Sequence, residues 1–451
     1  MTTFPSDDFL TGQGIGWRAG YLAGVTAERR RAGGGGGDSN PGSPLLGSLM
    51  DEWSGLFEAE VLPRMDPTSR AVLAQVNCAG RDAVRLPTDL ACAGRTVGVK
   101  LKLVDFFGSV GRLAWAKASG CPWVAQTCRH VARGGDLEAL QWAREHGCPW
   151  HAGACWFAAL GGHLDVVEWL IATGADINYA SYHNGTTAVY VAAYNGHLDV
   201  LGLLIDAGAN VDITHNNGGT PLYVAAQLGC LDVVARLIAA GADLTKARTE
   251  TGDTPLYVAA QNGHTGVVAQ LTAAGVDVNQ ALTNDETTPL FAAAQWGHVE
   301  VVERLLAAPG VDVNLASHTG DTPLLIATNN GHLEVVERLL AAPGVDVNLA
   351  SNNGTTPLLI AAKYGHTEVV ERLIAAPGVN VNLAHITGGT PLYVAAQNGH
   401  MDVVGRLLAA PGVDVNRAHQ NGATPLSIAL ANGYEEVVQK LRAAGAIEPH
   451  G

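Results

Sequence analysis

The sequence is short of charge, and above all of positive charge. Only 15% of the 451 residues are charged, against about 25% in an average globular protein. Asp and Glu outnumber Lys and Arg by 42 to 27, which gives a net charge of −15 with His neutral. Such a chain repels the phosphate backbone of nucleic acids, and no run of Lys and Arg offsets the repulsion. We therefore expect no binding to nucleic acid.

Long apolar runs are missing as well. No stretch approaches the roughly 18 consecutive apolar residues of a membrane-spanning helix, and residues 1–10 are acidic, without the apolar segment of a secretory signal. The seven cysteines are an odd number in a long chain, which favours reduced thiols over a disulfide framework. These features predict an intracellular protein, cytoplasmic or nuclear, that does not associate with membranes.

What the sequence does contain is a repeat. The tripeptide Thr-Pro-Leu recurs at a spacing of 34 residues, at Thr220, Thr254, Thr288, Thr322, Thr356, Thr390 and Thr424. The dipeptide Gly-His follows the same spacing, for example at Gly297 and Gly331. A period of this length is typical of a solenoid, in which each unit buries its apolar surface against the next.

The unit that begins at Thr322 illustrates the predicted structure. Thr322 can cap a short apolar helix and Pro323 suits its first position, while Gly331 permits the left-handed conformation that ends it. A second helix, amphipathic at spacings of three and four, is expected over residues 332–342. Residues 345–354 alternate in polarity and then turn, which predicts a β-hairpin finger.

The motifs Thr-Pro-Leu, Ala-Ala, Gly-His, Val-Val, Leu-Leu and Gly-(Ala/Val)-Asp-Val-Asn at this period resemble the ankyrin repeat. The resemblance covers residues 153–447 in nine units. It implies an all-α solenoid with short β-hairpin fingers, which serves as a scaffold for protein partners. The sequence departs from the family where His usually follows Thr-Pro-Leu, and has instead Tyr223, Tyr257, Phe291, Leu325, Leu359, Tyr393 and Ser427. We expect ring and aliphatic packing to replace the hydrogen bond of that His without changing the fold.

The resemblance also places the two residues before each Gly-His on the concave groove of the stack. Here they are mostly neutral amides with three aromatics, which suits a protein or peptide partner better than an anionic polymer. The predicted partner-binding residues are Tyr194, Gln227, Leu228, Gln261, Asn262, Gln295, Trp296, Asn329, Asn330, Tyr364, Gln397 and Asn398. The alternative is that Trp296 and Tyr364 only pack between units.

Two weaker units precede the array, within residues 99–152. Cys-Pro-Trp turns begin at Cys121 and Cys148, 27 residues apart, which indicates ankyrin-like helix pairs whose finger is shortened to a tight turn. With Cys128 and Cys155 these residues could suggest a zinc site, but paired ligands usually lie two to four residues apart. Equivalent positions in stacked units are also about 8–10 Å apart. Packing is therefore favoured over metal binding, and no metal or cofactor is expected.

Residues 51–86 are similar to the F-box, a small helical motif that docks on the Skp-type adaptor of cullin ubiquitin ligases. The similarity rests on Met-Asp-Pro at 65–67, Val76 and Arg81, although the family's opening Leu-Pro and late Trp are missing. The alternative function is thus a substrate-recognition subunit of a ubiquitin ligase. A compatible alternative is that the helices of residues 51–98 only cap the exposed end of the stack. The implied adaptor-binding residues are Val61, Leu62, Met65, Leu73 and Val76.

No catalytic constellation is evident. The finger carboxylates belong to separate units, at Asp277, Asp312, Asp346 and Asp414, so no acid and base face one substrate. The His residues recur beside helix-ending Gly residues, which indicates a structural role. We therefore predict a monomeric protein that is not an enzyme.

The finger sequence Leu-x5-Asp-(Val/Ile)-Asn resembles the site that asparaginyl hydroxylases modify in ankyrin proteins. It ends at Asn178, Asn279, Asn314, Asn348 and Asn416. A structural role of these side chains within the finger explains the pattern equally well.

The expected organisation has five parts. Residues 1–50, with a run of five Gly, form a flexible segment. Residues 51–98 form the small helical domain, 99–152 the weak units, 153–447 the ankyrin-like array and 448–451 a tail.

Overall fold

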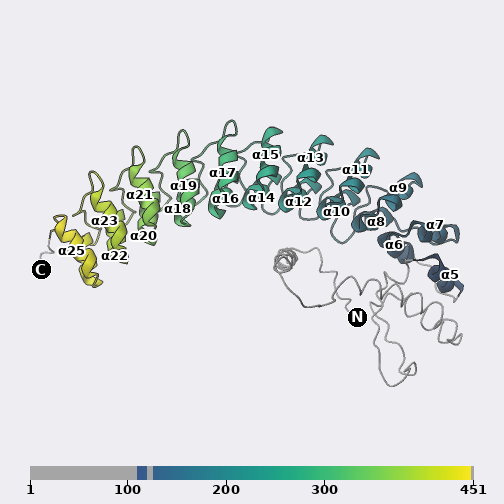
Figure 1. The fold of residues 1–451 in the computed structure, drawn as a ribbon, viewed down its shortest axis with the longest axis horizontal. Coiled ribbons are helices and arrows are strands. Elements are labelled where there is room, and N and C mark those ends of the chain that lie inside the picture. The colour runs from purple at the N-terminus through teal and green to yellow at the C-terminus, as the bar shows by residue number, and fades with distance from the viewer. Residues whose placement is uncertain (1–108, 119–124, 448–451) are drawn as a thin grey trace, which may run out of the picture. The chain divides into compact units, whose positions relative to one another are not determined.

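The computed structural model describes residues 109–118 and 125–447 (Figure 1). The predictions for residues 1–50, 51–98 and 448–451 lie outside the described residues. This holds for the whole F-box-like segment with Val61, Leu62, Met65, Leu73 and Val76.

The described residues form helices that follow one another in pairs. The first helices are α5 (Val110–Ala118), α6 (Ala125–Gly134) and α7 (Leu137–Glu145). The inner helices of the pairs are α8 (Ala154–Gly161), α10 (Ala188–Asn195), α12 (Pro221–Leu228), α14 (Pro255–Gln261), α16 (Pro289–Trp296), α18 (Pro323–Asn329), α20 (Pro357–Tyr364), α22 (Pro391–Asn398) and α24 (Pro425–Ala431). The outer helices are α9 (Leu164–Ala172), α11 (Leu198–Asp206), α13 (Leu231–Ala239), α15 (Thr265–Ala273), α17 (Val299–Leu306), α19 (Leu333–Leu340), α21 (Thr367–Ala375), α23 (Met401–Ala409) and α25 (Glu435–Ala443).

The Thr-Pro-Leu motif starts each inner helix that carries it, as predicted. In α18 the Thr322 hydroxyl accepts a hydrogen bond from the Leu325 amide at 3.2 Å, and Pro323 occupies the first turn. Gly331 follows this helix with a φ of 71°, where a side chain would be strained. Capping and termination are therefore local properties of the repeated sequence.

The core runs along the whole row of pairs. In α19 the side chains of Val335, Val336 and Leu339 are buried, and their counterparts in the other outer helices belong to the same continuous cluster. Each inner helix packs on the inner helix of the next pair, and each outer helix from α9 to α23 packs on the next outer helix. No pair covers its own apolar face, which is why the units must stack.

The β-hairpin fingers are not confirmed, because the described residues contain no strand. The finger between α19 and α20 is instead a series of turns, in which the Asn348 amide donates to Asp346 Oδ1 at 2.9 Å and the Gly354 amide to the Ser351 carbonyl at 2.8 Å. Its tip is joined to the preceding finger by a main-chain bond from the Asn352 amide to the Thr319 carbonyl at 2.9 Å. Such isolated bonds are too few to build a strand ladder.

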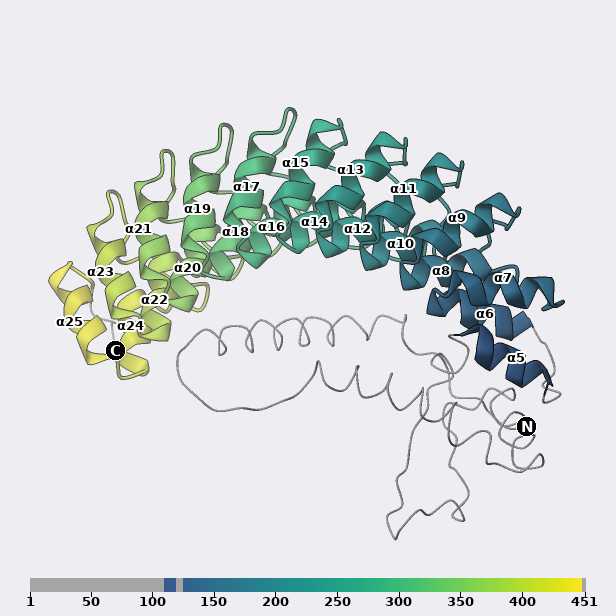
Figure 2. The same cartoon turned by 45° about the vertical axis from the view of Figure 1, so that its right-hand side comes forward.

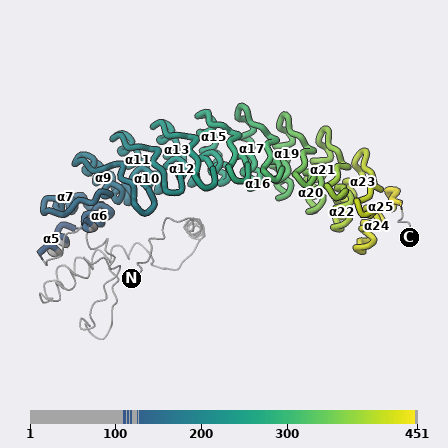
Figure 3. Tube along the Cα trace, turned by 180° about the vertical axis from the view of Figure 1, so that it is seen from behind, coloured from purple at the N-terminus to yellow at the C-terminus, as the bar shows by residue number. Residues whose placement is uncertain are grey.

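The pairs from α8/α9 to α24/α25 form a curved row (Figures 1 and 2). The inner helices lie along its concave side and the outer helices along its convex side, and the reverse view shows the same arrangement (Figure 3). The stacked, elongated array is therefore as predicted. Among the described helices, none combines the length and apolar character that crossing a membrane requires.

Candidate functional site

The His residues of the Gly-His motifs connect consecutive units. His298 Nε2 lies 3.0 Å from the Gln261 carbonyl oxygen and His332 Nε2 lies 3.1 Å from that of Gln295. A carbonyl only accepts, so the Nε2 atom carries the proton and donates. The role predicted for these His residues is structural, and these contacts support it.

The predicted partner-binding residues lie at or near the carboxyl ends of the inner helices, beside these His contacts. Six are exposed, namely Asn262, Trp296, Asn330, Tyr364, Gln397 and Asn398. Six are half-buried, namely Tyr194, Gln227, Leu228, Gln261, Gln295 and Asn329. They recur at equivalent positions of successive units, so they form two rows along the carboxyl ends of the inner helices.

Several of the exposed amides already have hydrogen-bond partners within the fold. Asn330 Nδ2 donates to the Gln295 carbonyl of the preceding unit at 2.8 Å. Asn262 and Asn398 donate to carbonyls one turn back in their own helices, at 2.9 and 2.8 Å. These donors therefore help to hold the rows in place, and fewer amide N–H groups face outward than the composition suggests.

Two aromatic side chains of this surface are exposed. Trp296 at the end of α16 is 59% exposed and Tyr364 at the end of α20 is 50% exposed. Lys363 Nζ lies 5.3 Å from the centre of the Tyr364 ring, within the range of a cation–π contact. Tyr194, by contrast, is half-buried and packs against the core.

Charge is distributed unequally between the two helix rows. Among the inner helices α8 to α24, Lys363 is the one charged residue. The outer helices carry acidic and basic residues that pair between units, as in the 2.6 Å contacts Arg338–Glu303 and Arg372–Glu337. The inner surface is therefore almost neutral within a chain of net charge −15.

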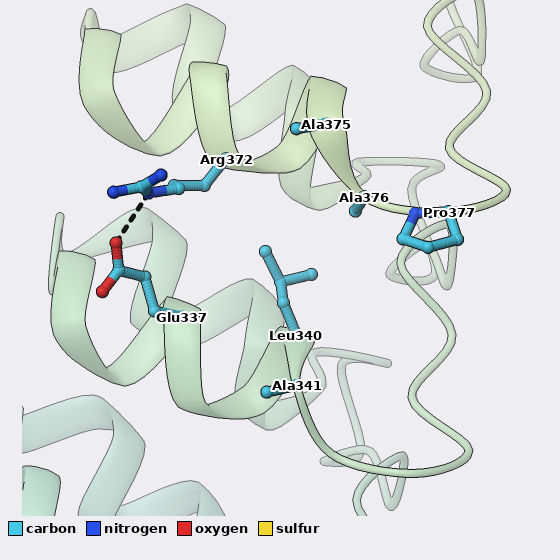
Figure 4. A pocket seen from close by; sticks show the side chains of 7 residues that line it. All are labelled: Glu337, Leu340, Ala341, Arg372, Ala375, Ala376 and Pro377. Carbon is cyan, nitrogen blue, oxygen red and sulfur yellow. Dashed lines mark ion pairs between the residues drawn. The ribbon is translucent and has the colours of Figure 1, made fainter.

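A shallow hollow lies between the outer helices α19 and α21 (Figure 4). The ion pair of Glu337 and Arg372 borders it, and the remaining lining is aliphatic: Leu340, Ala341, Ala375, Ala376 and Pro377. These side chains come from two stacked units, in which Ala341 and Ala375 are the equivalent pair. The hollow offers no unpaired polar group to a ligand, and we do not assign it a role.

Comparison with protein-family models agrees with this architecture. The model for ankyrin repeats in three copies matches residues 155–248, 245–317, 309–385 and 367–449, which is more than half of the chain. The chain belongs to the ankyrin repeat family. A model of the single ankyrin repeat also matches residues 126–182, which include α6 to α9. A search of curated proteins found no match.

The family match indicates what the array does in general terms. Ankyrin repeats generally bind protein partners and act as interaction scaffolds. The F-box-like interpretation of residues 51–86, and with it the ubiquitin-ligase alternative, is not supported by these comparisons.

The ankyrin units of this chain keep a hydrogen bond where packing alone was expected. The Tyr223 hydroxyl donates to Asp253 of the next unit, and the Tyr257 hydroxyl lies 3.2 Å from Thr287 Oγ1. Burial, followed by the bond to Asp253, raises the pKa of Tyr223. The packing prediction was therefore wrong for these two residues, because a phenol combines a ring with a polar tip. Tyr393 does pack as predicted, with its ring stacked on His419 at 5.0 Å.

The finger Asn residues hold neighbouring ankyrin units together. Asn348 Nδ2 donates to the Gly378 carbonyl at 2.8 Å, while Asn348 Oδ1 accepts from the Asn380 amide at 2.8 Å. We call this two-bond arrangement the Asn clamp. It recurs at Asn279, Asn314 and Asn382. The sequence pattern missed Asn382, because Ile374 and Asn380 stand where the motif has Leu and Asp.

The first and the last Asn of the pattern also accept a main-chain amide with their side-chain oxygen. Asn178 Oδ1 accepts from the Asn210 amide and Asn416 Oδ1 from the Ile447 amide, both at 2.8 Å. The structural explanation of the pattern therefore has direct support, and hydroxylation stays a prediction.

The cysteines of the amino-terminal units form a contact that the sequence comparison missed. The thiols of Cys128 and Cys148 are hydrogen-bonded, and this bond together with burial raises the pKa of Cys128. Cys155 is buried, which raises its pKa to about 12. Cys121 lies outside the described residues, and the described part of the chain contains no group of three or more His, Cys, Asp or Glu that could hold a metal ion. Comparing equivalent repeat positions could not reveal a contact between non-equivalent ones.

Proposed function

We propose that this ankyrin protein is a non-enzymatic scaffold that binds a protein partner on the concave side of its array. The observation that carries the proposal is the exposure of Trp296 and Tyr364 on inner helices whose other large apolar residues are mostly buried. Large aromatic side chains are common anchors of protein interfaces. Two of them left open on one side of a stacked array favour a binding surface over packing between units.

The polar groups of the array support a scaffold rather than an enzyme. His298 and its counterparts donate to main-chain carbonyls. The finger carboxylates, such as Asp346, accept from the amide two residues further on. Groups engaged in this way hold turns and units together, and they do not converge on one position where a substrate could react.

The low charge of the inner helices bears on the class of partner. With Lys363 as their one charged residue, they cannot neutralise a run of phosphates. A protein surface of amide and apolar groups matches them better.

Site-specific photo-crosslinking tests the proposal. A photoreactive amino acid at Trp296 is expected to capture a partner in the native cell, whereas the same group at Arg304, which is exposed on outer helix α17, is expected not to capture it. With the purified partner, Trp296→Ala and Tyr364→Ala should each weaken binding by about 1–3 kcal/mol and leave the melting temperature nearly unchanged. If both variants lower the melting temperature and leave the affinity unchanged, the aromatics serve packing and the proposal is wrong.

A further inference from the structure

The concave side differs between the two halves of the array. Each inner helix has an aliphatic residue three and four positions before the predicted partner-binding pair, and residues at these spacings share one helix face. In the amino-terminal half this residue is buried, at Val191, Val224 and Val258. In the carboxy-terminal half Ile326 and Val394 are partly exposed, whereas Ala292 and Ile360 at the same position are buried. Two separate apolar side chains, Ile326 and Val394, are therefore accessible in the part of the array that also carries Trp296 and Tyr364.

The spacing of the two aromatics limits what can bind both. Trp296 ends α16 and Tyr364 ends α20, and α18 packs between these two helices. Stacked helices lie about 8–10 Å apart, so the two positions are separated by about 16–20 Å. An extended chain advances about 3.3 Å per residue and covers this separation with five or six residues. A helix, with a rise of 1.5 Å, would need about 11–13.

The side chains between the two aromatics favour the extended chain. Asn329 and Asn330 of the intervening unit are amides, and Asn329 Nδ2 donates to Asn330 Oδ1 at 3.0 Å. Each Asn Nδ2 carries two hydrogens, and one is used within the fold, by Asn330 on the Gln295 carbonyl and by Asn329 on Asn330 Oδ1. The second hydrogen of each amide and Asn329 Oδ1 can pair with the N–H and C=O groups of an extended backbone. A helix satisfies these groups internally and would lay side chains against the amides.

The charge of the surface adds one further requirement. Lys363 is exposed beside Tyr364 and is the one cation on the inner helices. Because the surrounding side chains are neutral, this one cation favours a partner with one carboxylate at the matching position.

We propose that helices α16 to α22 bind an extended segment of a partner protein that has two apolar side chains six residues apart, which places both on one face of the segment, and a carboxylate beside the second one. Trp296 contacts the first apolar side chain, Tyr364 the second, and Lys363 the carboxylate. Ile326 on α18 adds an apolar contact between the two aromatics, and Val394 on α22 adds one beyond Tyr364. This inference rests on the proposed function and specifies the partner of the same surface.

Selection from a displayed library of random peptides tests the inference on the full-length protein. Peptides of about 16 residues accommodate both the extended and the helical spacing. The expected result is enrichment of two apolar residues six positions apart, with Asp or Glu next to the second. Enrichment of anchors about 11–13 positions apart, of basic peptides, or of no peptide at all would overturn the inference.

Matched charge reversals test the role of Lys363. Lys363→Glu is expected to change the preferred residue beside the second anchor from acidic to basic. Arg304→Glu makes the same charge change on exposed outer helix α17 and is expected to leave the selection unchanged. If both variants still select peptides with an acidic residue beside the second anchor, Lys363 does not bind the carboxylate.

Aromatic truncation separates this inference from the proposed function. Trp296→Ala is expected to lower the affinity for an enriched peptide about tenfold or more. The circular dichroism spectrum and the melting temperature of the protein should not change. If binding falls in this way but the enriched peptides follow another pattern, the surface binds proteins and only the peptide assignment fails. If the enriched peptides bind Trp296→Ala and Tyr364→Ala as tightly as the unchanged protein, the proposed function fails as well.

Discussion

Single side chains connect the units of this array more extensively than the main chain does. Adjacent finger tips share isolated main-chain bonds, such as that from Ile386 to Asn353, whereas each Asn clamp adds two bonds across the same boundary. The amide is suited to this task because it offers a donor and an acceptor at its two ends. A carboxylate of similar shape could only accept.

The Asn clamp at Asn348 makes a direct prediction for stability. Asn348→Ala removes two bonds between units, and each such bond contributes about 0.5–1.5 kcal/mol, so the free energy of unfolding should fall by about 1–3 kcal/mol. Asn398→Ala removes a bond within helix α22 and should cost less. Urea denaturation of both variants measures the difference, and equal losses would show that the clamp adds nothing between units.

Burial of Cys155 predicts a dependence of stability on pH. The pKa of this thiol is raised from 9.0 to about 12 in the folded protein. The folded state therefore keeps a proton that the unfolded chain loses, and stability present below about pH 9 declines as the pH rises toward 12. Denaturation at about pH 8 and pH 10 should show a smaller decline for Cys155→Ala than for the unchanged protein. An identical decline in both would contradict the prediction.

At the scale of helices and fingers, local signals determined how much the sequence could predict. The Thr322 cap, Pro323 and Gly331 act on their own neighbours, so the start and end of α18 could be derived from the sequence. The fingers could not, because the alternation around Asp346 resembles a strand while its carboxylate in fact accepts from the Asn348 amide in a turn.

The candidate site shows the same division. That Trp296 and Tyr364 would lie on one surface followed from their repeat positions, and both are exposed. The side-chain amide of Asn330 donates a hydrogen bond to the Gln295 carbonyl of another unit. The hydrogen bond from the Tyr223 hydroxyl to Asp253 is likewise a contact between units. Neither contact leaves a periodic signal in the sequence.

The Tyr223 link predicts different roles for two tyrosines at the same repeat position. Tyr223→Phe removes the hydroxyl that donates to Asp253, a carboxylate only 8% exposed, so stability should fall by about 1–3 kcal/mol. Tyr393→Phe keeps the ring that stacks on His419 and should change stability little. Thermal melts of both variants decide the point, and equal melting temperatures would mean that ring packing alone joins these units.

At the scale of the whole array, stability is set by contacts between neighbouring units. The last pair, α24 and α25, packs on α22 and α23 and presents Glu436 and Arg442 to solvent on the end of the row. Every other unit buries an apolar face against the unit that follows it. The polar side chains of the last pair cover this face at the end of the row.

We therefore expect removal of residues 424–451 to destabilise the array more than removal of an internal unit. The truncation uncovers the apolar face of α22 and α23, so the melting temperature should fall and binding of an apolar dye should rise. Deletion of residues 322–355 takes out α18 and α19 but joins Asp321 to Thr356, which restores a normal boundary. This variant should keep a cooperative melt and bind little dye. Comparable dye binding by both variants would contradict an additive stack.

The regularity of the clamps has a consequence for how this protein can change. Residues 300–317 and 334–351 are identical in sequence, and their Asn residues make the same clamp on the following unit. Unequal recombination between two such stretches duplicates or excises one module while leaving every remaining junction intact. Each event moves Trp296 and Tyr364 apart or together by one step of about 8–10 Å. Copy number, rather than point mutation, is thus the simplest way to change the length of the partner segment that we propose for this surface.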